Sequence, residues 1–362
     1  MPNSPEIAIV ILNWNGEKLF GEFLPSVIRN SSGPGIHIYI ADNGSTDGSI
    51  SLIKKDFPEV RLIDLQKNHG FAKGYNLALK EVKADYYILL NSDVEVTPGW
   101  IDPCISQLEQ DNRLVAVQPK ILSYKKPHQF EYAGAAGGFI DLFGYPFCRG
   151  RILNRMEPDL GQYNKPTPIF WASGACMFIK SKAFHEMGGF DSDFWAHMEE
   201  IDLCWRLKNQ GYSIGYQPES VIFHLGGGTL SYNSPQKVYL NFRNNLFMLF
   251  KNLPTNRFHR IFFARLALDD VAALKFLAGF YFSSFYAVLK AHASFYRNLK
   301  SLIQKRKRLL RLTTVKNHDE IYPKSIMWKF FIQKKRHYSE LENHPGHEKE
   351  INLHRKDLHL SD

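Results

Sequence analysis

Short apolar runs alternate with stretches of helical periodicity along the first quarter of the chain. Predominantly apolar runs cover residues 7–12, 36–41, 60–65 and 86–90, and each is too short to be a helix. Between them apolar residues recur at helical spacing, as they do from Leu19 to Ile28. Strand and helix alternate four times, so the sequence predicts an α/β fold with a mostly parallel central sheet flanked by helices.

Polar residues follow these strands at their carboxyl ends, where open α/β sheets bind ligands. Asp42 lies in ADNGSTDGS (41–49), where it is suited either to accept a hydrogen bond from uracil or thymine or to form an Asx turn. Asp93 follows the fourth strand, where a carboxylate can hold a divalent cation against a diphosphate; the alternative is a solvated turn residue. The glycine-rich stretch NHGFAKGYN (68–76) begins a helix, and helix starts favour anions.

The pattern becomes irregular between residues 122 and 168, which predicts a long loop or hairpin region carrying substrate contacts. A later helix, predicted to end near Gln210, has Glu199, Glu200 and Asp202 close to its start. Acids there suit the helix dipole, and a catalytic base in the same place is equally plausible. His224 lies in an apolar strand, where a histidine is more often a core residue than a ligand.

The composition of the chain, and the motifs that it lacks, disfavour several classes of protein. A hydrophobic content of 44% and a charged content of 22% are typical of an ordered globular protein, and 362 residues suggest two or three structural units. The start does not resemble a signal peptide. The four cysteines have no CxxC spacing, which indicates reduced thiols in a cytosolic protein. A Rossmann dehydrogenase and a P-loop NTPase are disfavoured because neither of their glycine motifs is present.

The positive charge in excess, +9 for the whole chain, is concentrated in the C-terminal third. Residues 252–362 hold 21 Lys and Arg against 10 Asp and Glu, which gives +11, so residues 1–251 carry −2. Residues 258–289 are rich in Phe, Tyr, Leu and Ala, but charges at one end make them marginal for a membrane span of about 20 residues. We therefore expect a helical hairpin or an interfacial helix lying on a membrane, with packing against the rest of the chain as the alternative.

Basic runs at 305–308 and 334–336 would favour anionic lipid headgroups. No nucleic-acid-binding fold accompanies them, so we expect no nucleic-acid partner. The sequence thus divides into a catalytic unit at 1–251, a basic, aromatic-rich helical extension at 252–336, and a polar tail at 337–362 that we expect to be disordered.

Eight motifs, in order, resemble the family 2 glycosyltransferases of the GT-A fold, and most of all their bacterial rhamnosyltransferase-like branch. They lie within roughly residues 5–251. The motifs are VILNWNG (10–16), ADNGSTDGS (41–49), NHGFAKGYN (68–76), LLNSDVEV (89–96), WASGACMFIK (171–180), GGFDSDFW (188–195), MEEIDLCWRLKNQGY (198–212) and VIFHLGG (221–227).

The resemblance implies a role for each matching residue. It implies a catalytic base at Glu200, with Glu199 as the alternative, and metal ligands at Asp93 and His224 for Mg²⁺ or Mn²⁺. Asn91 replaces the first acid of the family's metal motif, and Glu200 replaces an aspartate. The implied nucleotide-sugar contacts are Asn13, Asn15, Asp42, Asn43, Asn68, Gly70, Lys73, Asn76, Asn91 and Ser92. The implied acceptor and donor pocket comprises Trp171, Ser173, Gly174 and Trp195, with buried core as the alternative for either tryptophan.

The function implied is an inverting, metal-dependent transfer of a sugar from dTDP-rhamnose or a UDP-sugar to a glycan or lipid-linked acceptor, in the synthesis of a cell-surface polysaccharide. The implied location is cytoplasmic, on the inner face of the cell membrane. A noncatalytic nucleotide-sugar or glycan-binding homologue is the alternative, favoured only by the Asn91 and Glu200 departures. A nucleotidyltransferase is a third hypothesis, but the glycine-rich signature of that class is missing from this sequence. The sequence leaves the oligomeric state open.

Overall fold

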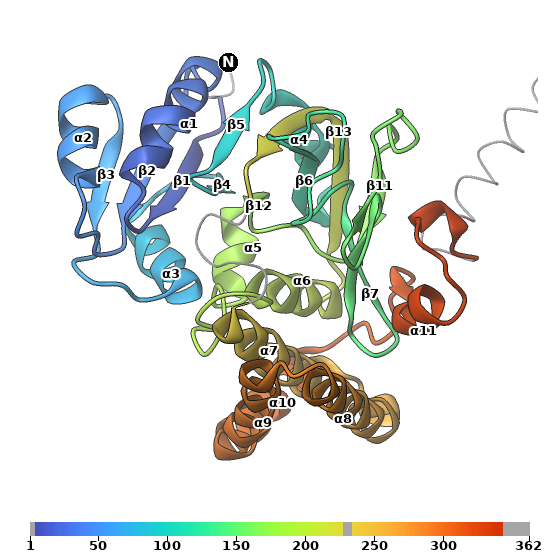
Figure 1. The fold of residues 1–362 in the computed structure, drawn as a ribbon. Coiled ribbons are helices and arrows are strands. Elements are labelled where there is room, and N and C mark those ends of the chain that lie inside the picture. The colour runs from blue at the N-terminus through green and yellow to red at the C-terminus, as the bar shows by residue number, and fades with distance from the viewer. Residues whose placement is uncertain (1–3, 227–233, 343–362) are drawn as a thin grey trace, which may run out of the picture.

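A mixed sheet forms the middle of the molecule (Figure 1). The computed structural model describes residues 4–226 and 234–342, and within them nine strands join this sheet. The strands are β1 (Ile7–Asn13), β2 (Ile36–Asp42), β3 (Arg61–Asp64), β4 (Tyr86–Leu90), β5 (Val94–Val96), β6 (Leu114–Ser123), β11 (Thr167–Ile169), β12 (Cys176–Lys180) and β13 (Ser213–His224). Their order is β11-β13-β6-β12-β4-β1-β2-β3, and β5 pairs with β13.

One half of the sheet is parallel. β1 pairs in parallel with β2 and β4, and β2 pairs in parallel with β3. Ile7 to Ile11 are all buried, as expected for a strand covered on both faces. Asn13 lies opposite Asp42 in the register, so the polar ends of β1 and β2 meet. Beyond β4 the sheet is mixed, because β12 runs antiparallel to both β4 and β6. The predicted α/β fold with a central sheet flanked by helices is confirmed.

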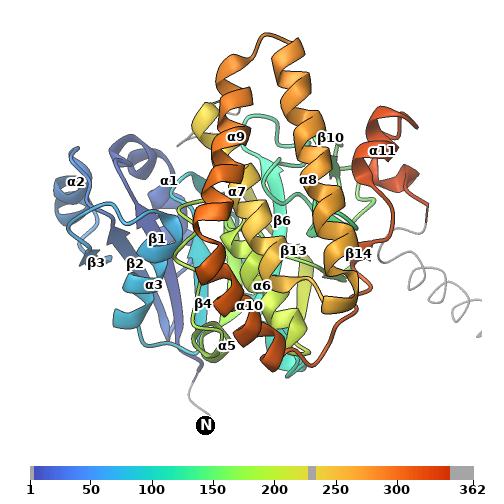
Figure 2. The same ribbon diagram turned by 90° about the horizontal axis from the view of Figure 1, so that it is seen from below.

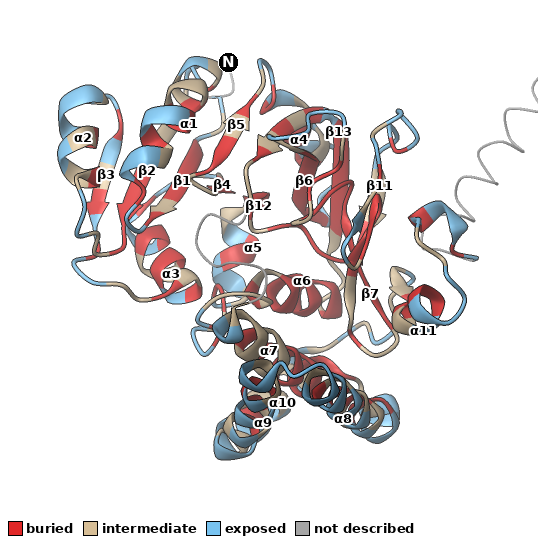
Figure 3. Cartoon of the chain, viewed as in Figure 1, coloured by how far each residue is buried: buried red, intermediate tan, exposed pale blue. Residues whose placement is uncertain are grey.

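The helices of this part of the chain cover both faces of the sheet and its carboxyl edge (Figure 1). α1 presents Phe20, Phe23, Leu24 and Val27 to the core from the helical spacing seen in the sequence. α6 lies at the carboxyl edge and is buried along most of its length (Figure 3). The helices are α1 (Glu17–Asn30), α2 (Ser49–Asp56), α3 (Phe71–Glu81), α4 (Asp102–Gln110), α5 (Ser181–Glu186) and α6 (Glu199–Asn209).

The irregular region of the sequence forms a second, smaller sheet. Its strands are β7 (Gly138–Asp141), β8 (Pro146–Cys148), β9 (Arg151–Ile152), β10 (Arg155–Met156) and β14 (Ile321–Tyr322), in the order β10-β9-β8-β7-β14. The first four strands form antiparallel pairs, in agreement with the predicted hairpin region. β14 comes from far along the chain and pairs in parallel with β7.

The chain after β14 packs against this second sheet. The short helix α11 (Ile326–Phe331) follows, and Tyr338 in the 3-10 helix η1 (Tyr338–Glu340) is fully buried. The Tyr338 amide donates to Glu157 Oε1 over 2.6 Å. The disordered tail expected from residue 337 therefore does not begin there, because an aromatic side chain anchors residues 337–342; residues 343–362 lie outside the described chain.

Helix α7 (Pro235–Asn252) is the last helix of the predicted 1–251 unit, and three further long helices lie in the predicted C-terminal extension: α8 (Thr255–Ala278), α9 (Phe282–Arg297) and α10 (Leu299–Leu312). α7 packs against α6, while α8 and α9 form the expected hairpin, whose far end projects beyond the rest of the molecule (Figure 2). Within residues 4–226 and 234–342, each helix falls short of the length or hydrophobicity that crossing a membrane requires.

Candidate active site

A hydrogen-bond network joins the ends of β1 and β2. Asp42 is fully buried; its Oδ1 accepts from Asn13 Nδ2 and its Oδ2 accepts from the Ser45 amide, both over 2.9 Å. Asn13 Oδ1 is buried and has no partner among the described residues. Since a carboxylate has about four acceptor sites, Asp42 keeps the capacity to accept a further hydrogen bond.

The same edge of the sheet holds the 68–76 loop. Asn43 Oδ1 accepts from the His69 amide over 2.9 Å, and Asn68 Oδ1 accepts from the Gly70 amide over 2.8 Å. Gly70 has φ +76°, and a β-carbon there would lie 2.8 Å from the Trp195 side chain. Only glycine therefore fits, and the implied nucleotide-binding loop lies directly against the 188–195 loop.

The predicted nucleotide contacts differ in how free their side chains are. Asn15 Oδ1 accepts from the Thr46 amide over 2.7 Å, which ties the β1 end to the 41–49 loop. The Asn76 side chain instead bonds to the protein backbone: its amide group donates to Phe190 O over 2.7 Å and accepts from Phe190 N over 2.9 Å. Asn76 thus joins α3 to the 188–195 loop, whereas Lys73 is exposed on the same helix.

Asp93, in the turn between β4 and β5, and His224, at the end of β13, lie together at the carboxyl edge. His224 Nε2 is 3.1 Å from Asp93 Oδ1 and 3.4 Å from Asn91 Nδ2, and Ser92 is half-buried beside them. Burial opposes ionisation of Asp93, but His224 outweighs it and lowers the pKa of the carboxyl group. Burial likewise opposes protonation of His224, but Asp93 and then Glu131 raise its pKa to about 10.

Glu131 is a site residue that the sequence did not reveal. Its Oε2 lies 3.1 Å from His224 Nδ1, at an angle outside hydrogen-bond geometry, and accepts from the Ala133 amide over 2.5 Å. Glu131 is buried, and it lies in the irregular region where no motif or periodicity distinguishes one acid from another. His224 is thus held between two carboxylates rather than packed in an apolar core.

Glu199 and Glu200 form an acidic pair at the start of α6, in which Glu199 is buried and Glu200 is half-buried. The Oε2 atoms of both are buried and lack hydrogen-bond partners among the described residues. Burial raises the pKa of Glu200 to about 7, against the smaller effect of the backbone N–H groups at the helix start. Burial and then the charge of Glu200 raise the pKa of Glu199 well above its ordinary value. A carboxylate with a pKa near 7 suits a general base.

The backbone leading into this pair is strained. His197 and Met198 have φ values of +71° and +73°, which are unfavourable for residues with side chains. Asn244, fully buried on α7, donates to Ala196 O over 2.8 Å and to His197 O over 2.7 Å. The C-terminal helix α7 thus fixes the strained segment that positions Glu199 and Glu200. No sequence signal distinguished Asn244 from its neighbours.

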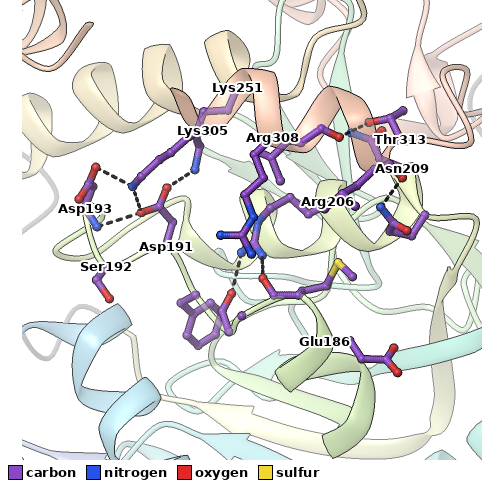
Figure 4. Close-up of a pocket in the computed structure, with 17 residues that line it drawn as sticks. Glu186, Asp191, Ser192, Asp193, Arg206, Asn209, Lys251, Lys305, Arg308 and Thr313 are labelled. Carbon is purple, nitrogen blue, oxygen red and sulfur yellow. Dashed lines mark hydrogen bonds and ion pairs between the residues drawn. The ribbon is translucent and has the colours of Figure 1, made fainter. Parts of the chain in front are cut away.

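Cations from the C-terminal helices brace the 188–195 loop (Figure 4). Lys251 pairs with Asp191 and, over 2.9 Å, with Asp202, while Lys305 from α10 lies 2.5 Å from Asp191 and 2.7 Å from Asp193. Burial opposes ionisation of Asp191, but the two lysines outweigh it and lower its pKa. A pocket of about 350 Å³ lies between the 188–193 segment and α10, next to these ion pairs.

The predicted acceptor and donor pocket residues fall into two groups. Trp171 is buried, packs on Gly138 and donates its indole N–H to Phe139 O over 2.9 Å, which favours the core alternative for it. Ser173 is also buried, and its amide donates to Gln118 Oε1 over 2.9 Å. Gly174 approaches the Phe71 ring. Trp195, in contrast, is 47% exposed beside Gly70, where it can contact a ligand.

Comparisons with known proteins agree with this geometry. A family model described as glycosyl transferase family 2 matches residues 8–188. The chain is 27% identical over 241 residues to an N-acetylglucosaminyl-diphospho-decaprenol L-rhamnosyltransferase of Mycobacterium tuberculosis, covering 60% of this chain and 75% of the relative. It is also 24% identical over 244 residues to the low-salt glycan biosynthesis hexosyltransferase Agl10 of Haloferax volcanii, covering 66% of this chain and 74% of the relative.

Among solved structures, the chain is similar to GalNAc-T7 crystallised with UDP, GalNAc and Mn²⁺, with a TM-score of 0.53 and 17% identity. The match covers 69% of this chain and 48% of that longer chain, so this likeness concerns the fold alone.

Proposed function

The chain belongs to glycosyl transferase family 2, and from that premise we propose that it transfers a sugar from a nucleotide diphosphate sugar to a hydroxyl acceptor with inversion at the anomeric carbon. The observation that supports this proposal most strongly is the acidic pair of buried Glu199 and half-buried Glu200, at the same sheet edge as Asp42 and Asp93. The donor that we propose is dTDP-rhamnose or a UDP-sugar, with Asp42 accepting the ring N–H of the base.

The residues at the sheet edge fit a divalent cation, Mg²⁺ or Mn²⁺. Asp93 supplies a carboxylate oxygen and His224 an imidazole nitrogen, and their atoms are already 3.1 Å apart. Glu131 lies on the other ring nitrogen, as carboxylates do behind metal-bound histidines. Within the described residues no third His, Cys, Asp or Glu completes the set, so diphosphate oxygens would supply further ligands. When bound, the cation would neutralise charge on the departing diphosphate.

Glu200 is the residue that we propose as the base. Its carboxylate takes the proton of the acceptor hydroxyl, whose oxygen forms a bond to the anomeric carbon as the bond from that carbon to the diphosphate oxygen breaks. The nucleoside diphosphate leaves, and the proton remains on Glu200. A pKa of about 7 lets Glu200 be ionised before the transfer and accept the proton during it. Glu199 is more deeply buried, which leaves Glu200 as the more accessible of the two.

The acceptor is proposed from the nature of the relatives. The mycobacterial relative is named for an acceptor in which a diphosphate joins a sugar to a polyprenol. We extend this to a glycan or lipid-linked acceptor for the present chain, in the synthesis of a cell-surface polysaccharide. Such an acceptor would be met at the inner face of the cell membrane.

A donor panel tests the proposal. Purified protein is incubated with dTDP-rhamnose and a set of UDP-sugars plus Mg²⁺ or Mn²⁺, and release of the nucleoside diphosphate is measured for wild type, Glu200→Gln and Glu199→Gln. We expect one donor to be turned over, with loss of activity on chelation and in Glu200→Gln. Turnover that survives in Glu200→Gln but is lost in Glu199→Gln would move the base to Glu199. Nucleotide binding without any turnover, in the presence of a lipid-linked acceptor extract, would favour the noncatalytic alternative.

A further inference from the structure

The far end of the α8–α9 hairpin exposes large apolar side chains. Phe280 is 79% exposed, Tyr281 67% and Phe282 59%, and all three lie at the turn that projects furthest in Figure 2. Further exposed apolar residues continue along the two helices, which Figure 3 shows as largely exposed. These are Val271, Leu274 and Leu277 on α8, and Tyr286, Leu289 and Tyr296 on α9. An apolar surface of this kind is unusual for a part of a protein that faces only water.

The hairpin turn is also strained. Phe280 has φ +59°, a conformation that is a genuine outlier for a bulky residue. Gly279, which would adopt that conformation without cost, lies one position earlier with an ordinary φ. The chain thus places an aromatic side chain at the most exposed point of the turn despite the strain, which indicates that the ring has a role there.

Charges flank this apolar end and are mostly positive. Residues 276–289 contain no charged side chain, and Lys275 and Lys290 border them on either side. Residues 255–297 hold six Lys and Arg against two Asp, and one of these, Asp269, is buried against Arg265. The exposed hairpin is therefore cationic at the border of its apolar end.

Helix α11 extends the same surface. Lys275 Nζ lies 4.5 Å from the centre of the Phe331 ring, so α11 is a neighbour of α8 at the level of Lys275. Trp328 is 57% exposed and Ile332 is exposed as well. Lys334, Lys335 and Arg336 follow directly. Exposed aromatic rings beside cations are the side chains that membrane-interface segments use.

We propose that the α8–α9 hairpin end, together with α11, is a docking surface for a monolayer of anionic lipid. The proposal rests on the proposed function only in that a lipid-linked acceptor would require such a surface. At 1.5 Å of rise per residue, Lys275 lies about 7 Å and Lys290 about 15 Å along the helices from Phe280. A depth of roughly 5–10 Å is that of helices buried at the boundary of headgroups and acyl chains. The aromatic turn would therefore enter the monolayer while Lys275 meets the headgroups.

A lipid surface fits better than a second copy of the chain. A twofold dimer through this surface would place each patch against an identical patch, so Lys275 and Lys290 would meet the same cations of the other copy. An anionic monolayer instead supplies the opposite charge, worth about 1 kcal/mol for each Lys or Arg near it.

Vesicle flotation with the full chain and no donor tests the proposal. The protein is mixed with phosphatidylcholine vesicles with or without phosphatidylglycerol, and the bound fraction is compared for wild type, Phe280→Asn with Phe282→Ser, and Lys275→Gln with Lys290→Gln. Leu160→Ser, at an apolar residue that is 82% exposed and lies outside the α8–α9 hairpin and α11, is the matched control. Asparagine tolerates the backbone conformation at position 280, so the aromatic variant should fold.

We expect binding to the anionic vesicles only. The affinity should fall at least about 100-fold in the aromatic variant, because it removes two buried rings that each contribute about 1.5–3 kcal/mol. It should fall about 30-fold in the lysine variant, since each cation is worth about fivefold. The control should bind as wild type does. Equal binding of all variants, or a dimer in vesicle-free solution that the aromatic change dissociates, would overturn the proposal. Donor turnover is measured separately, so failure of the proposed function leaves this result intact.

Discussion

Replacing Glu200 by glutamine should stabilise the folded protein at alkaline pH while it abolishes transfer. Burial raises the pKa of Glu200 to about 7 from an ordinary value of 4.5. A group whose pKa is higher in the folded state binds more protons there, so the free energy of unfolding falls as the pH rises from about 4.5 to about 7. Each unit is worth 1.36 kcal/mol, which gives an upper limit of about 3 kcal/mol at pH 8.

The assay is urea unfolding of wild type and Glu200→Gln at pH 5 and pH 8, in the absence of nucleotide. Interaction with Glu199 and access of water reduce the limit, so we expect the variant to be more stable by about 1–3 kcal/mol at pH 8 and by much less at pH 5. Glu81→Gln, at an exposed site on α3, controls for the simple loss of a charge. A variant no more stable than wild type at pH 8 would refute the reasoning that burial raises the pKa.

Four other changes test separate parts of the site. Glu131→Gln should weaken Mn²⁺ binding about 10–100-fold, measured by titration calorimetry, because Glu131 supports the outer nitrogen of His224. Asn244→Ala should lower kcat and cost about 1–3 kcal/mol in urea unfolding, since two part-buried carbonyl oxygens lose their donor. Lys305→Met should destabilise by about 1 kcal/mol in the same assay, because the lysine is partly exposed. Gly70→Ala should abolish nucleotide binding by calorimetry, because the new methyl group meets Trp195.

For each of these variants, one result would contradict the prediction. Unchanged Mn²⁺ affinity in Glu131→Gln, with Glu131→Ala equally unaffected, would show that Glu131 plays no part in metal binding. A normal kcat in Asn244→Ala would separate the strained backbone from catalysis. Full stability of Lys305→Met would mean that Lys251 alone holds Asp191. Ordinary nucleotide affinity in Gly70→Ala would require the 188–195 loop to move.

The sequence was most informative where a local pattern carries the chemistry. The apolar runs that end in polar residues predicted β1, β2 and β4 and the position of Asp42 and Asp93 at their carboxyl ends, because strand period and strand length are local properties. The sequence also showed Glu199 and Glu200 as neighbours at a helix start. The pairing of Asp93 with His224 could only be expected from the resemblance, since 131 residues separate them.

What the sequence could not predict are partners brought together by tertiary packing. Glu131 reaches His224 from the irregular region, and Asn244 reaches His197 from a helix that local propensity marks as ordinary. Trp171 illustrates the same limit: the sequence cannot tell an indole that contacts a sugar from one that fills the space beside Gly138. Only burial and direction separate such residues, and both depend on the whole fold.

The pairing of β7 with β14 has a consequence for the order of events during synthesis. Ile140 and its partner Ile321 are separated by 181 residues. Tyr338, which lies further along the chain, is buried against Phe139 and Phe147 of the same sheet. At roughly 5–20 residues added per second, the ribosome needs about 10–40 s to make the stretch between Ile140 and Ile321. The sheet beside Glu131 therefore stays incomplete while the first half of the chain has already emerged. A nascent chain would gain its nucleotide loop early and its finished site only after residue 338 has been made.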